Sequence, residues 1–580
     1  MMHPRSTPSF ILLLPAVFLL CGCGGGSCPS PGVSHGSDSP FKTEYLQPVR
    51  IVLEGGMVDN PGHLIPKGRG QVSTSEGEVT RFSPGGFVLL DFGREIQGGL
   101  QIARAMGGDK KAALFRVTLG ESVSEALSDL SEKGTTATNE HSVRDFEMAV
   151  PWLGTSEVGD SGFRFARVEL LDFSEDVPVV SIRAKSVMRD LPYRGSFRCS
   201  DPLLDSIWKT GAYTVQLCMQ DFLWDGIKRD RLVWIGDMHP EVMTVGAVFG
   251  EQETVRRSLD FVRDETPASG WMNGIPAYSL WWTLIHHQLY RWYADKEYLL
   301  EQKEYLRGLL THVLSSINGD SEAYQGGMRF IDWPSYDNPD VVHAGLQALS
   351  VMALEAGAEM TSLIGEGDLS AKCSAVAKTL RTNVPDPVGN SQAAALLCIA
   401  GMLDPQIASS IIIENGPSKL TSFMGYYILE ALSRGGRYEE AMTFISKYWG
   451  LMLELGATTF WEDFNYGNGL VAARIDEVVP EGKFDIHKDG GAWCYVGLRR
   501  SLCHGWASGP TPWLSRHVLG IEPVGEGLRE VRIEPHLGPL QWAEGTFPTP
   551  YGDIAVSHRR NPDGSVSSKV TLPRGVRRVK

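Results

Sequence analysis

The hydrophobic positions follow one period near the start of the chain and another in its middle. Over residues 43–190 they form short runs, many of them alternating with polar positions and separated by Gly and Pro. The run 87–92 (FVLLDF) is ended by Gly93, and the segments 115–119 and 163–171 alternate apolar and polar residues. Such alternation is typical of half-buried strands. The segment 43–190 is therefore predicted to be an N-terminal antiparallel β-sandwich, and its polar stretch 121–144 a long loop.

After Pro192 the period becomes that of a helix. Apolar residues from Leu204 to Phe222 fall on one helical stripe, and Asp201 before Pro202 is a suitable helix N-cap. Successive helices joined by loops rich in Trp, Asp and Gly indicate a toroid of helical hairpins that carries its function on the loops. Further helices are predicted at 253–263, 278–294, 298–318, 341–356, 369–380, 391–401, 422–434 and 438–453.

From Leu519 short strand-like runs return, around 531–535, 554–556 and 566–572, with Gly and Pro turns between them. The predicted order is a β-sandwich, a large helical domain and a small second β domain. The boundaries that follow from these changes of period are 43–190, 191–517 and 518–580.

The first residues are predicted to be a targeting segment. An apolar run at 10–20 follows Arg5, is too short to span a bilayer and has the length of a secretory signal. It ends in a Cys-Gly-Cys sequence that resembles a lipobox, so residues 1–22 are predicted to be a lipoprotein signal peptide and Cys23 the lipidated residue. Residues 23–42 are rich in Gly, Ser and Pro, as a flexible linker is. We expect no later membrane span, and an exported protein that is lipid-anchored to a bacterial membrane, in the periplasm or at the cell surface.

The composition favours a neutral ligand with many hydroxyl groups. The formal net charge is −15, which argues against nucleic acid or an anionic surface as the main partner. Fifteen Trp and seventeen Tyr supply rings for the apolar face of a sugar, although most are expected to fill the core.

The cysteine spacing does not predict a metal site. Six of the nine Cys are scattered after residue 190 without a C-x-x-C pair. An oxidising compartment permits a Cys494–Cys503 disulfide, but buried free thiols are the simpler expectation. No catalytic Ser/His/Asp spacing, phosphate-binding loop or zinc-helix motif is present, so we expect neither a metal nor a cofactor.

Four segments combine acids or histidine with aromatic residues. They lie at 224–237, 330–337, 456–464 and 501–506. Inverting glycoside hydrolysis needs an acid that protonates the leaving oxygen and a second carboxylate that activates water. Glu462 and one Asp of the stretch Asp221–Glu241 are the natural pair.

Each of these segments also has a purely structural interpretation. The 221–241 stretch is consistent with ion pairs on a helix end, although Gly226 and Gly236 are expected to break a helix there. Asp332 is equally suited to cap the next helix, and a lone His504 is more often a core histidine than a ligand.

At this point the chain resembles the bacterial α-L-rhamnosidases of glycoside hydrolase family 78. Seven segments carry the resemblance over nearly the whole mature chain: 89–102 (LLDFGREIQGGLQI), 162–172 (GFRFARVELLD), 225–238 (DGIKRDRLVWIGDM), 330–335 (FIDWPS), 456–463 (GATTFWED), 501–521 (SLCHGWASGPTPWLSRHVLGI) and 531–545 (VRIEPHLGPLQWAEG). The resemblance implies a multidomain fold, with an (α/α)6 barrel catalytic domain flanked by an N-terminal β-sandwich and a small C-terminal β-sandwich. It also implies inverting release of terminal α-L-rhamnose, or a similar deoxy-sugar, from polysaccharide or glycoside.

The same resemblance implies roles for individual residues. Glu462 matches the general base, and Trp461 beside it a ring that stacks on the sugar. His504 matches a histidine that binds the sugar ring. The other expected substrate-binding residues are Asp225, Arg229, Trp234, Asp237, Asp332 and Trp333.

The chain departs from the family pattern at the acid. The commoner pattern reads R-D-E-R-x-G-W-x-G-D, whereas residues 229–237 read RDRLVWIGD and lack that Glu. Asp230 is the nearest candidate for the proton donor, with Asp225, Asp237 and Glu241 as alternatives. Three adjacent cations oppose protonation of Asp230, whereas apolar surroundings would favour it.

Two rival functions follow from the missing Glu. One is a non-catalytic surface glycan-binding protein with the same fold. The other is the same fold with a different action, such as a glycosidase of different sugar specificity or a lyase. The acidic, Trp-lined loops argue against the lyase.

Overall fold

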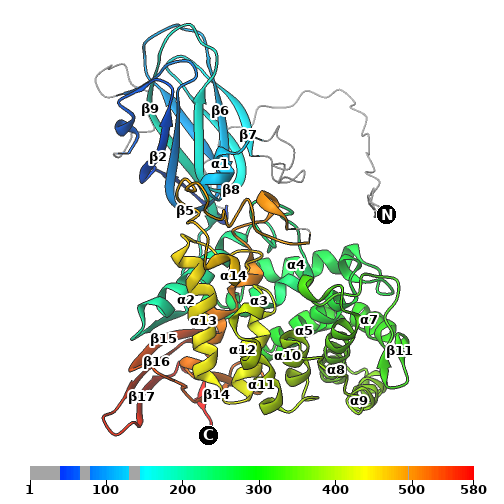
Figure 1. The fold of residues 1–580 in the computed structure, drawn as a ribbon. Coiled ribbons are helices and arrows are strands. Elements are labelled where there is room, and N and C mark those ends of the chain that lie inside the picture. Colours follow the sequence, from blue (N-terminus) through cyan, green and yellow to red (C-terminus); the bar gives the residue numbers. More distant parts are fainter. Residues whose placement is uncertain (1–38, 66–78, 130–143, 494) are drawn as a thin grey trace, which may run out of the picture. The chain divides into compact units, whose positions relative to one another are not determined.

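The N-terminal β region consists of nine strands that hydrogen-bond into one connected antiparallel sheet. This computed structural model describes residues 39–65, 79–129, 144–493 and 495–580 (Figure 1). The predicted signal peptide 1–22, Cys23 and most of the linker 23–42 lie outside the described residues. The strands are β1 Phe41–Leu46, β2 Arg50–Gly55, β3 Val58–Asp59, β4 Thr80–Phe82, β5 Phe87–Arg104, β6 Ala113–Gly120, β7 Asp145–Val150, β8 Thr155–Leu170 and β9 Val177–Arg189, with a 3₁₀ turn η1 at Pro61–Leu64.

The sheet has the order β3-β4-β9-β5-β8-β6-β7, with β1 beside β9 and β2 beside β5. The prediction that Gly93 ends a strand is wrong, because β5 continues to Arg104. Gly93 has a φ of 79°, and the register between β5 and β8 shifts between Asp91 and Ile96. A bulge at a left-handed glycine thus lets one strand change partner from β2 to β9 without ending.

The predicted loop at 121–144 is also wrong in part, because it begins with a short helix, α1 Val123–Leu127. Ser122 caps this helix by accepting a hydrogen bond from the Glu125 amide at 3.0 Å. Glu121, Glu125 and Arg144 are almost completely buried. The polar residues of this stretch suggested that it is exposed to solvent. The side chains of Glu121, Glu125 and Arg144 are instead buried and paired with charged groups, among them Lys228 from a distant part of the chain.

The helical domain follows the predicted period closely. Asp201 accepts a hydrogen bond from the Leu203 amide at 2.9 Å, so the predicted cap of the first helix is confirmed. The helices are α2 Pro202–Cys218, α3 Ile235–Val248, α4 Glu253–Glu265, α5 Pro276–Tyr293, α6 Lys296–Glu301, α7 Lys303–Ser315, α8 Pro339–Leu363, α9 Gly367–Leu380, α10 Ser391–Ile399, α11 Pro405–Asn415, α12 Gly425–Arg434, α13 Tyr438–Glu454, α14 Tyr466–Gly469 and α15 Pro510–Trp513. Short 3₁₀ or π turns lie at η2 Met272–Gly274, η3 Trp333–Ser335, η4 Pro417–Lys419, η5 Gly497–Arg499, η6 Gly505–Ser508 and η7 Leu514–Val518, and a two-stranded ribbon at β11 Ile317–Asn318 and β12 Ser321–Glu322.

The prediction that Gly236 breaks a helix is wrong. Gly236 lies inside α3, where an added Cβ would come within 2.1 Å of the Tyr278 ring. The glycine therefore allows α3 and α5 to approach closely. Helix α11 had no predicted counterpart.

Helix α8 meets the length and composition criteria for a membrane span, although no span after the N-terminus was expected. By length and composition alone α8 is long and apolar enough, but 83% of its most apolar window is buried inside the protein. It packs against α5, α9 and α10. Its apolar character therefore matches its place in the core of the helical domain.

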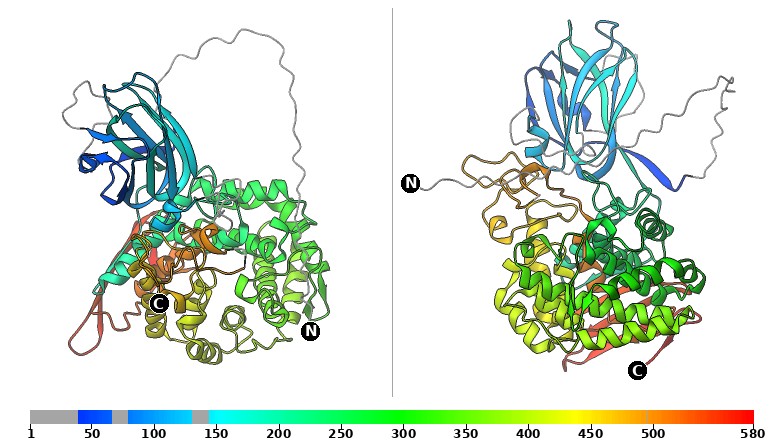
Figure 2. Two further views of the ribbon diagram at one scale, coloured as in Figure 1. Left: turned by 45° about the horizontal axis from the view of Figure 1, so that its top comes forward. Right: turned by 90° about the vertical axis from the view of Figure 1, so that its right-hand side faces the viewer.

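The C-terminal region contains two small sheets. One has the order β10-β15-β16-β17 and the other β13-β14-β18. Strand β10 comes from the segment just before α2, so the first sheet joins residues more than 340 positions apart, such as Ser196 and Thr546. Figure 2 shows this sheet in red against the helices. The strands are β10 Ser196–Cys199, β13 Ile521–Val524, β14 Glu530–Ile533, β15 Trp542–Thr549, β16 Gly552–Arg560, β17 Val566–Thr571 and β18 Arg577–Arg578.

The cysteines fit the expectation of buried thiols. Cys199, Cys218, Cys373, Cys398 and Cys503 are free and buried. Cys494 lies outside the described residues.

Candidate active site

Three of the four acidic and aromatic segments meet around His504. Its Nε2 atom lies 3.3 Å from Oε1 of Glu462, 3.5 Å from Oδ2 of Asp225 and 3.8 Å from Oδ2 of Asp237. All four side chains are at least 95% buried. The structure therefore brings together four of the predicted site residues, from positions 225 to 504, around one imidazole ring.

Glu462 is held by contacts on both carboxylate oxygens. Oε1 pairs with the Arg229 guanidinium, and Oε2 accepts a hydrogen bond from the Ser501 amide at 2.9 Å. Its backbone amide donates in turn to the Ser501 carbonyl at 3.0 Å, and Trp506 Nε1 donates to its carbonyl at 2.9 Å. Burial alone would raise the pKa of Glu462, but Arg229 and His504 lower it to about 2. The side chain is therefore an oriented, ionised carboxylate.

The histidine carries the complementary charge. Burial opposes protonation of His504, but Glu462 and Asp225 raise the pKa of His504 well above its usual value of 6.5. His504 is buried, as a core histidine would be, but carboxyl groups of three residues surround its Nε2 atom. A cation lies at the centre of the carboxylate cluster.

The two aspartates of the cluster have the opposite tendency to Glu462. Burial raises the pKa of Asp237 to about 8, against the effect of His504. Burial also raises the pKa of Asp225, against its hydrogen bond with His504. The Tyr278 hydroxyl donates to Oδ1 of Asp237 at 2.7 Å, which fixes that carboxyl group. At neutral pH the cluster therefore offers both an ionised carboxylate and a carboxyl group that holds its proton.

Asp230 lies at the edge of the cluster on a strained turn. Asp230 and Arg231 have φ values of 53° and 52°, in the left-handed region that non-glycine residues rarely occupy. Arg229 pairs with Oδ1 of Asp230 at 2.9 Å through Nη1 and with Glu462 through Nη2. One guanidinium thus links the candidate acid to the candidate base. Arg229, one of the cations adjacent in the sequence, is therefore in direct contact with the Asp230 carboxylate.

Three other predicted residues do not contact the His504 ring. Asp332 caps η3 through the Trp333 amide at 2.8 Å and accepts hydrogen bonds from Gln392 and Thr421 at 2.7 and 2.6 Å. Burial raises the pKa of Asp332 to about 7. The alternative interpretation of Asp332 as a cap therefore has direct structural support, and Trp333 packs edge-on against Tyr495. Trp461 is fully buried against Phe464, so its sugar-stacking role stays a prediction.

Several residues at the site were missed in the sequence. Tyr278 contacts Asp237 and lies edge-on to the predicted Trp234, and Trp506 packs 4.6 Å from the His504 ring. Glu241 was not missed, because it is one of the alternative proton donors named from the sequence; it is completely buried, and within the described residues neither of its carboxylate oxygens has a hydrogen-bond partner. The helical spacing of Asp237 and Glu241 was the available signal that both point to one side of α3.

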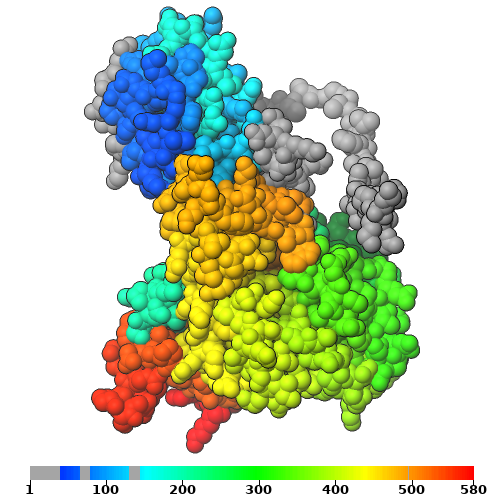
Figure 3. All heavy atoms as spheres, viewed as in Figure 1, coloured from blue at the N-terminus to red at the C-terminus, as the bar shows by residue number. Residues whose placement is uncertain are grey.

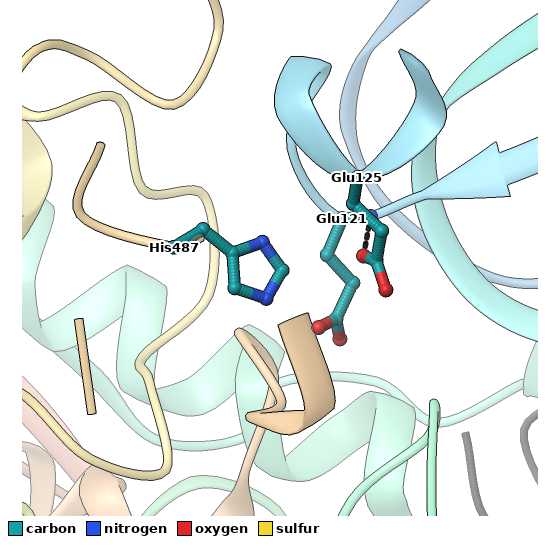
Figure 4. Close-up of side chains that lie close together, drawn as sticks. All are labelled: Glu121, Glu125 and His487. Carbon is teal, nitrogen blue, oxygen red and sulfur yellow. Dashed lines mark hydrogen bonds between the residues drawn. The ribbon is translucent and has the colours of Figure 1, made fainter. Parts of the chain in front are cut away.

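A second buried group of charges lies next to the cluster. Glu121, Glu125 and His487 place one potential ligand atom each within 4.8 Å of the others (Figure 4). Lys228 Nζ lies 3.2 Å from Glu121 and 3.1 Å from Glu125, so an ammonium group already supplies the positive charge there. His487 Nδ1 contacts Ser122 Oγ at 2.7 Å, and its Nε2 contacts the Arg500 carbonyl at 3.0 Å. These donors are therefore engaged by protein groups and do not form an open metal site.

Comparison with known proteins agrees with this arrangement. Residues 192–385 match the model of the bacterial α-L-rhamnosidase six-hairpin glycosidase domain, and residues 520–579 that of the bacterial α-L-rhamnosidase C-terminal domain. An α-L-rhamnosidase of Alteromonas sp. (strain LOR) is 25% identical over 465 residues, which cover 71% of this chain and 47% of that protein. The chain thus spans about half the length of this relative.

Solved structures share the fold. The family 78 rhamnosidase of Bacillus sp. GL1 is 22% identical with a TM-score of 0.68, over 86% of this chain and 55% of that chain. A Klebsiella oxytoca rhamnosidase with rhamnose bound is 19% identical with a TM-score of 0.66, over 82% of this chain and 96% of that chain. The six-hairpin helical domain with β-rich regions on both sides is therefore the expected fold. Residues 192–385 and 520–579 therefore match the six-hairpin and C-terminal domains of bacterial α-L-rhamnosidases.

Proposed function

We propose that this protein hydrolyses terminal α-L-rhamnosides, or glycosides of a similar deoxy-sugar, with inversion of configuration. The observation that carries the proposal is the buried cluster around His504, in which an ionised Glu462 lies near Asp237, a carboxyl group that retains its proton. The matches to two α-L-rhamnosidase domain models support the reaction class, and the (α/α)6 barrel remains the architecture that we infer for the helical hairpins.

In the proposed reaction Glu462 is the general base. It takes a proton from a water molecule, which attacks the anomeric carbon on the face opposite to the leaving group. Arg229, His504 and the Ser501 amide keep the carboxylate ionised and fix its direction. Asp225 would hold a sugar hydroxyl group, and so would Asp237 in the case where Asp230 is the proton donor.

The proton donor is Asp230 or Asp237. Asp230 lies at the edge of the site on the shortened loop, 2.9 Å from Arg229, and would need to gain a proton when substrate displaces this pairing. Asp237 is favoured by its pKa of about 8, since it holds a proton at neutral pH. Replacing each aspartate by Asn separates the two, because an aryl rhamnoside with a good leaving group needs little acid assistance. The true donor should then lose far more activity on an alkyl rhamnoside than on the activated one.

The decisive experiment is hydrolysis of an aryl α-L-rhamnoside by the protein without residues 1–22, followed by NMR. Appearance of β-L-rhamnose before the α anomer would establish inversion. The Glu462→Gln variant should reduce kcat at least about 10³-fold. Asp463→Asn is a matched control, because Asp463 is the next residue, is also largely buried and instead faces Arg500 at 3.8 Å. Near-normal turnover in Glu462→Gln would refute the role of the base.

The missing family Glu supports one alternative, a glycan-binding protein without turnover. Binding of rhamnosides to the wild type without any hydrolysis would favour it. For the location we propose a lipid anchor on Cys23 and export to a bacterial membrane surface. Mass spectrometry of the protein from its own membrane tests this, since an unmodified Cys23 would refute the anchor.

A further inference from the structure

We propose that the N-terminal β region takes part in catalysis through Glu121, a positioning residue that orients the base Glu462. This inference rests on the proposed function of Glu462. Glu121 directly follows β6 and precedes α1, whereas the residues that it positions lie some 380 positions later in the chain.

Glu121 binds the segment that carries the active-site histidine. Its Oε2 accepts a hydrogen bond from the Leu502 amide at 2.6 Å, and its Oε1 accepts one from the Ser501 hydroxyl at 3.1 Å. Glu121 is fully buried. A buried carboxylate that accepts two such bonds holds its partners more rigidly than a neutral acceptor would.

The segment that Glu121 holds is bonded directly to the base. The Ser501 amide donates to Oε2 of Glu462, and the Ser501 carbonyl accepts from the Glu462 amide. The Leu502 carbonyl accepts a hydrogen bond from the Thr459 hydroxyl at 2.8 Å. The path from Glu121 to the Glu462 carboxylate therefore passes through a single residue, Ser501.

The same carboxylate also reaches the loop of the candidate acid. Lys228 Nζ lies 3.2 Å from Oε2 of Glu121 and donates to the carbonyls of Leu498 and Arg500. The next residue, Arg229, pairs with Glu462. Glu121 thus contacts two segments that bind Glu462: residues 501–502 directly, and the loop with Arg229 through Lys228.

Glu125 provides an internal comparison. It is as deeply buried as Glu121 and lies 3.1 Å from the same Lys228, but its other partners are Arg144 and the Glu121 amide. Within the described residues it makes no hydrogen bond to the 501–502 segment. A variant of Glu125 therefore perturbs the same buried charges without releasing Ser501.

The test compares Glu121→Gln with Glu125→Gln in the otherwise intact protein. Gln at 121 keeps one oxygen for the Leu502 amide but places an amide NH₂ group against the Ser501 hydroxyl, which must then donate to the Cys503 carbonyl instead of to residue 121. A shift of Ser501 would displace the Glu462 carboxylate, and a misplacement of about 1 Å costs roughly 10²-fold in rate. We expect kcat to fall about 10- to 10²-fold in Glu121→Gln with little change in KM, and no more than about twofold in Glu125→Gln.

A pH profile separates positioning from loss of stability. The charged groups that face Glu462 are Arg229, His504, Asp237, Asp463 and Arg500, and the Ser501 amide is its neutral donor. Weakening that hydrogen bond raises the pKa of Glu462. The acid limb of kcat/KM should therefore move to higher pH in Glu121→Gln but not in Glu125→Gln. The charged groups that face Glu121 are Lys228, Glu125 and Glu95. Each Glu→Gln variant removes one carboxyl group next to Lys228, so the two variants change the charge around Lys228 by the same amount.

The outcomes are distinct. An inactive wild type overturns the proposed function and this role together. An active wild type in which both variants lose equal activity, or in which the acid limb stays in place, overturns the positioning role alone. Should Glu121→Gln fail to fold, Ser501→Ala removes the hydroxyl that contacts Glu121 and keeps the amide that contacts Glu462. A smaller loss in kcat with the same shift of the acid limb is expected, and an unchanged profile would overturn the proposal.

Discussion

The two β regions join the helical domain in opposite ways. The C-terminal sheets share their hydrophobic core with the helices, since Phe197, Val531, Ile533 and Phe547 belong to the same buried cluster as the helical residues. The N-terminal region has a separate core, which includes Phe115 and Val168.

The N-terminal region instead reaches the helical domain through polar groups. Arg164 donates to the Gly456 carbonyl at 2.8 Å, the Glu95 amide donates to the Thr458 hydroxyl at 2.9 Å, and the Gly162 amide donates to the Ile227 carbonyl at 3.0 Å. In Figure 3 the orange surface around residues 450–500 lies against the blue N-terminal region. The acceptors lie on the two segments that bear Glu462 and Asp230.

This difference separates stability from function. An apolar contact is tolerant of direction, whereas a buried hydrogen bond or ion pair fixes both distance and angle. The C-terminal region is therefore suited to stabilise the helical domain, and the N-terminal region to orient its catalytic loops.

The largest expected difference is between two arginines. Arg164 is buried and pairs with Asp91 at 2.8 Å, whereas Arg194 pairs with Asp553 at 2.7 Å on the surface. Arg164→Ala should destabilise the protein by about 3–5 kcal/mol because it leaves a buried charge without its main partner. Arg194→Ala should cost about 0–1 kcal/mol. Urea unfolding measures both, and equal losses would contradict the comparison.

Substitution of two glycines tests the same difference between the N-terminal and C-terminal contacts with the helical domain. A Cβ at Gly162 would lie 2.6 Å from Cγ1 of Ile227, and one at Gly545 would lie 2.1 Å from the Ser196 carbonyl oxygen. Each Gly→Ala change should cost about 1–3 kcal/mol by overpacking. Only Gly162→Ala should also reduce kcat of the folded protein, by roughly tenfold, because Ile227 begins the loop of the candidate acid. Steady-state kinetics at a temperature where both variants are folded decides this.

The pH dependence of stability should have opposite signs for two buried carboxyl groups of the helical domain, Asp237 and Glu430. Burial raises the pKa of Asp237 to about 8, so the folded state keeps a proton that the unfolded chain releases above about 4, and stability falls as pH rises from about 4 to 8. Burial would raise the pKa of Glu430, but Arg516 and His517 lower it to about 2, so its contribution is complete above about 4.5 and is lost as pH falls toward 2.

Two variants isolate these contributions. Relative to the wild type, Asp237→Asn should gain stability between pH 5 and 8, by up to about 1.4 kcal/mol per pH unit. Glu430→Gln should be destabilised relative to wild type at pH 7, and this difference should shrink only below about pH 4.5. Thermal unfolding over pH 3 to 9 measures both, and parallel curves for Asp237→Asn and wild type would refute the raised pKa.

The smallest effect on stability and kcat is expected for an exposed contact between the N-terminal region and the helical domain. Arg231 donates to the Asp160 carbonyl at 2.6 Å and lies over the Trp224 ring, but its carboxylate partner is 66% exposed. Arg231→Ala should change stability by less than about 1 kcal/mol and kcat by no more than about threefold. A larger loss in kcat would place the orienting contacts at the surface rather than among the buried groups.

Local patterns predicted much of the fold and of the site. Helical periodicity located α5 and α13 within two residues at each end but missed the last two turns of α8. The motif resemblance selected Asp225, Asp237, Glu462 and His504, which the structure places around one ring. Helix α1 and the continuation of β5 were not predicted, because both depend on partners far away in the chain.

The sequence by itself determined the order of β, helical and β regions, because hydrophobic period and helix caps are local properties. It also determined which residue types are available for acid and base chemistry. Only the tertiary structure decided their protonation, since the pKa values of Glu462 and Asp237 depend on burial and on Arg229 and His504 brought from distant segments. It also decided that Glu121 lies beside Ser501, because a charged residue in a polar stretch is buried only where the fold supplies its partners.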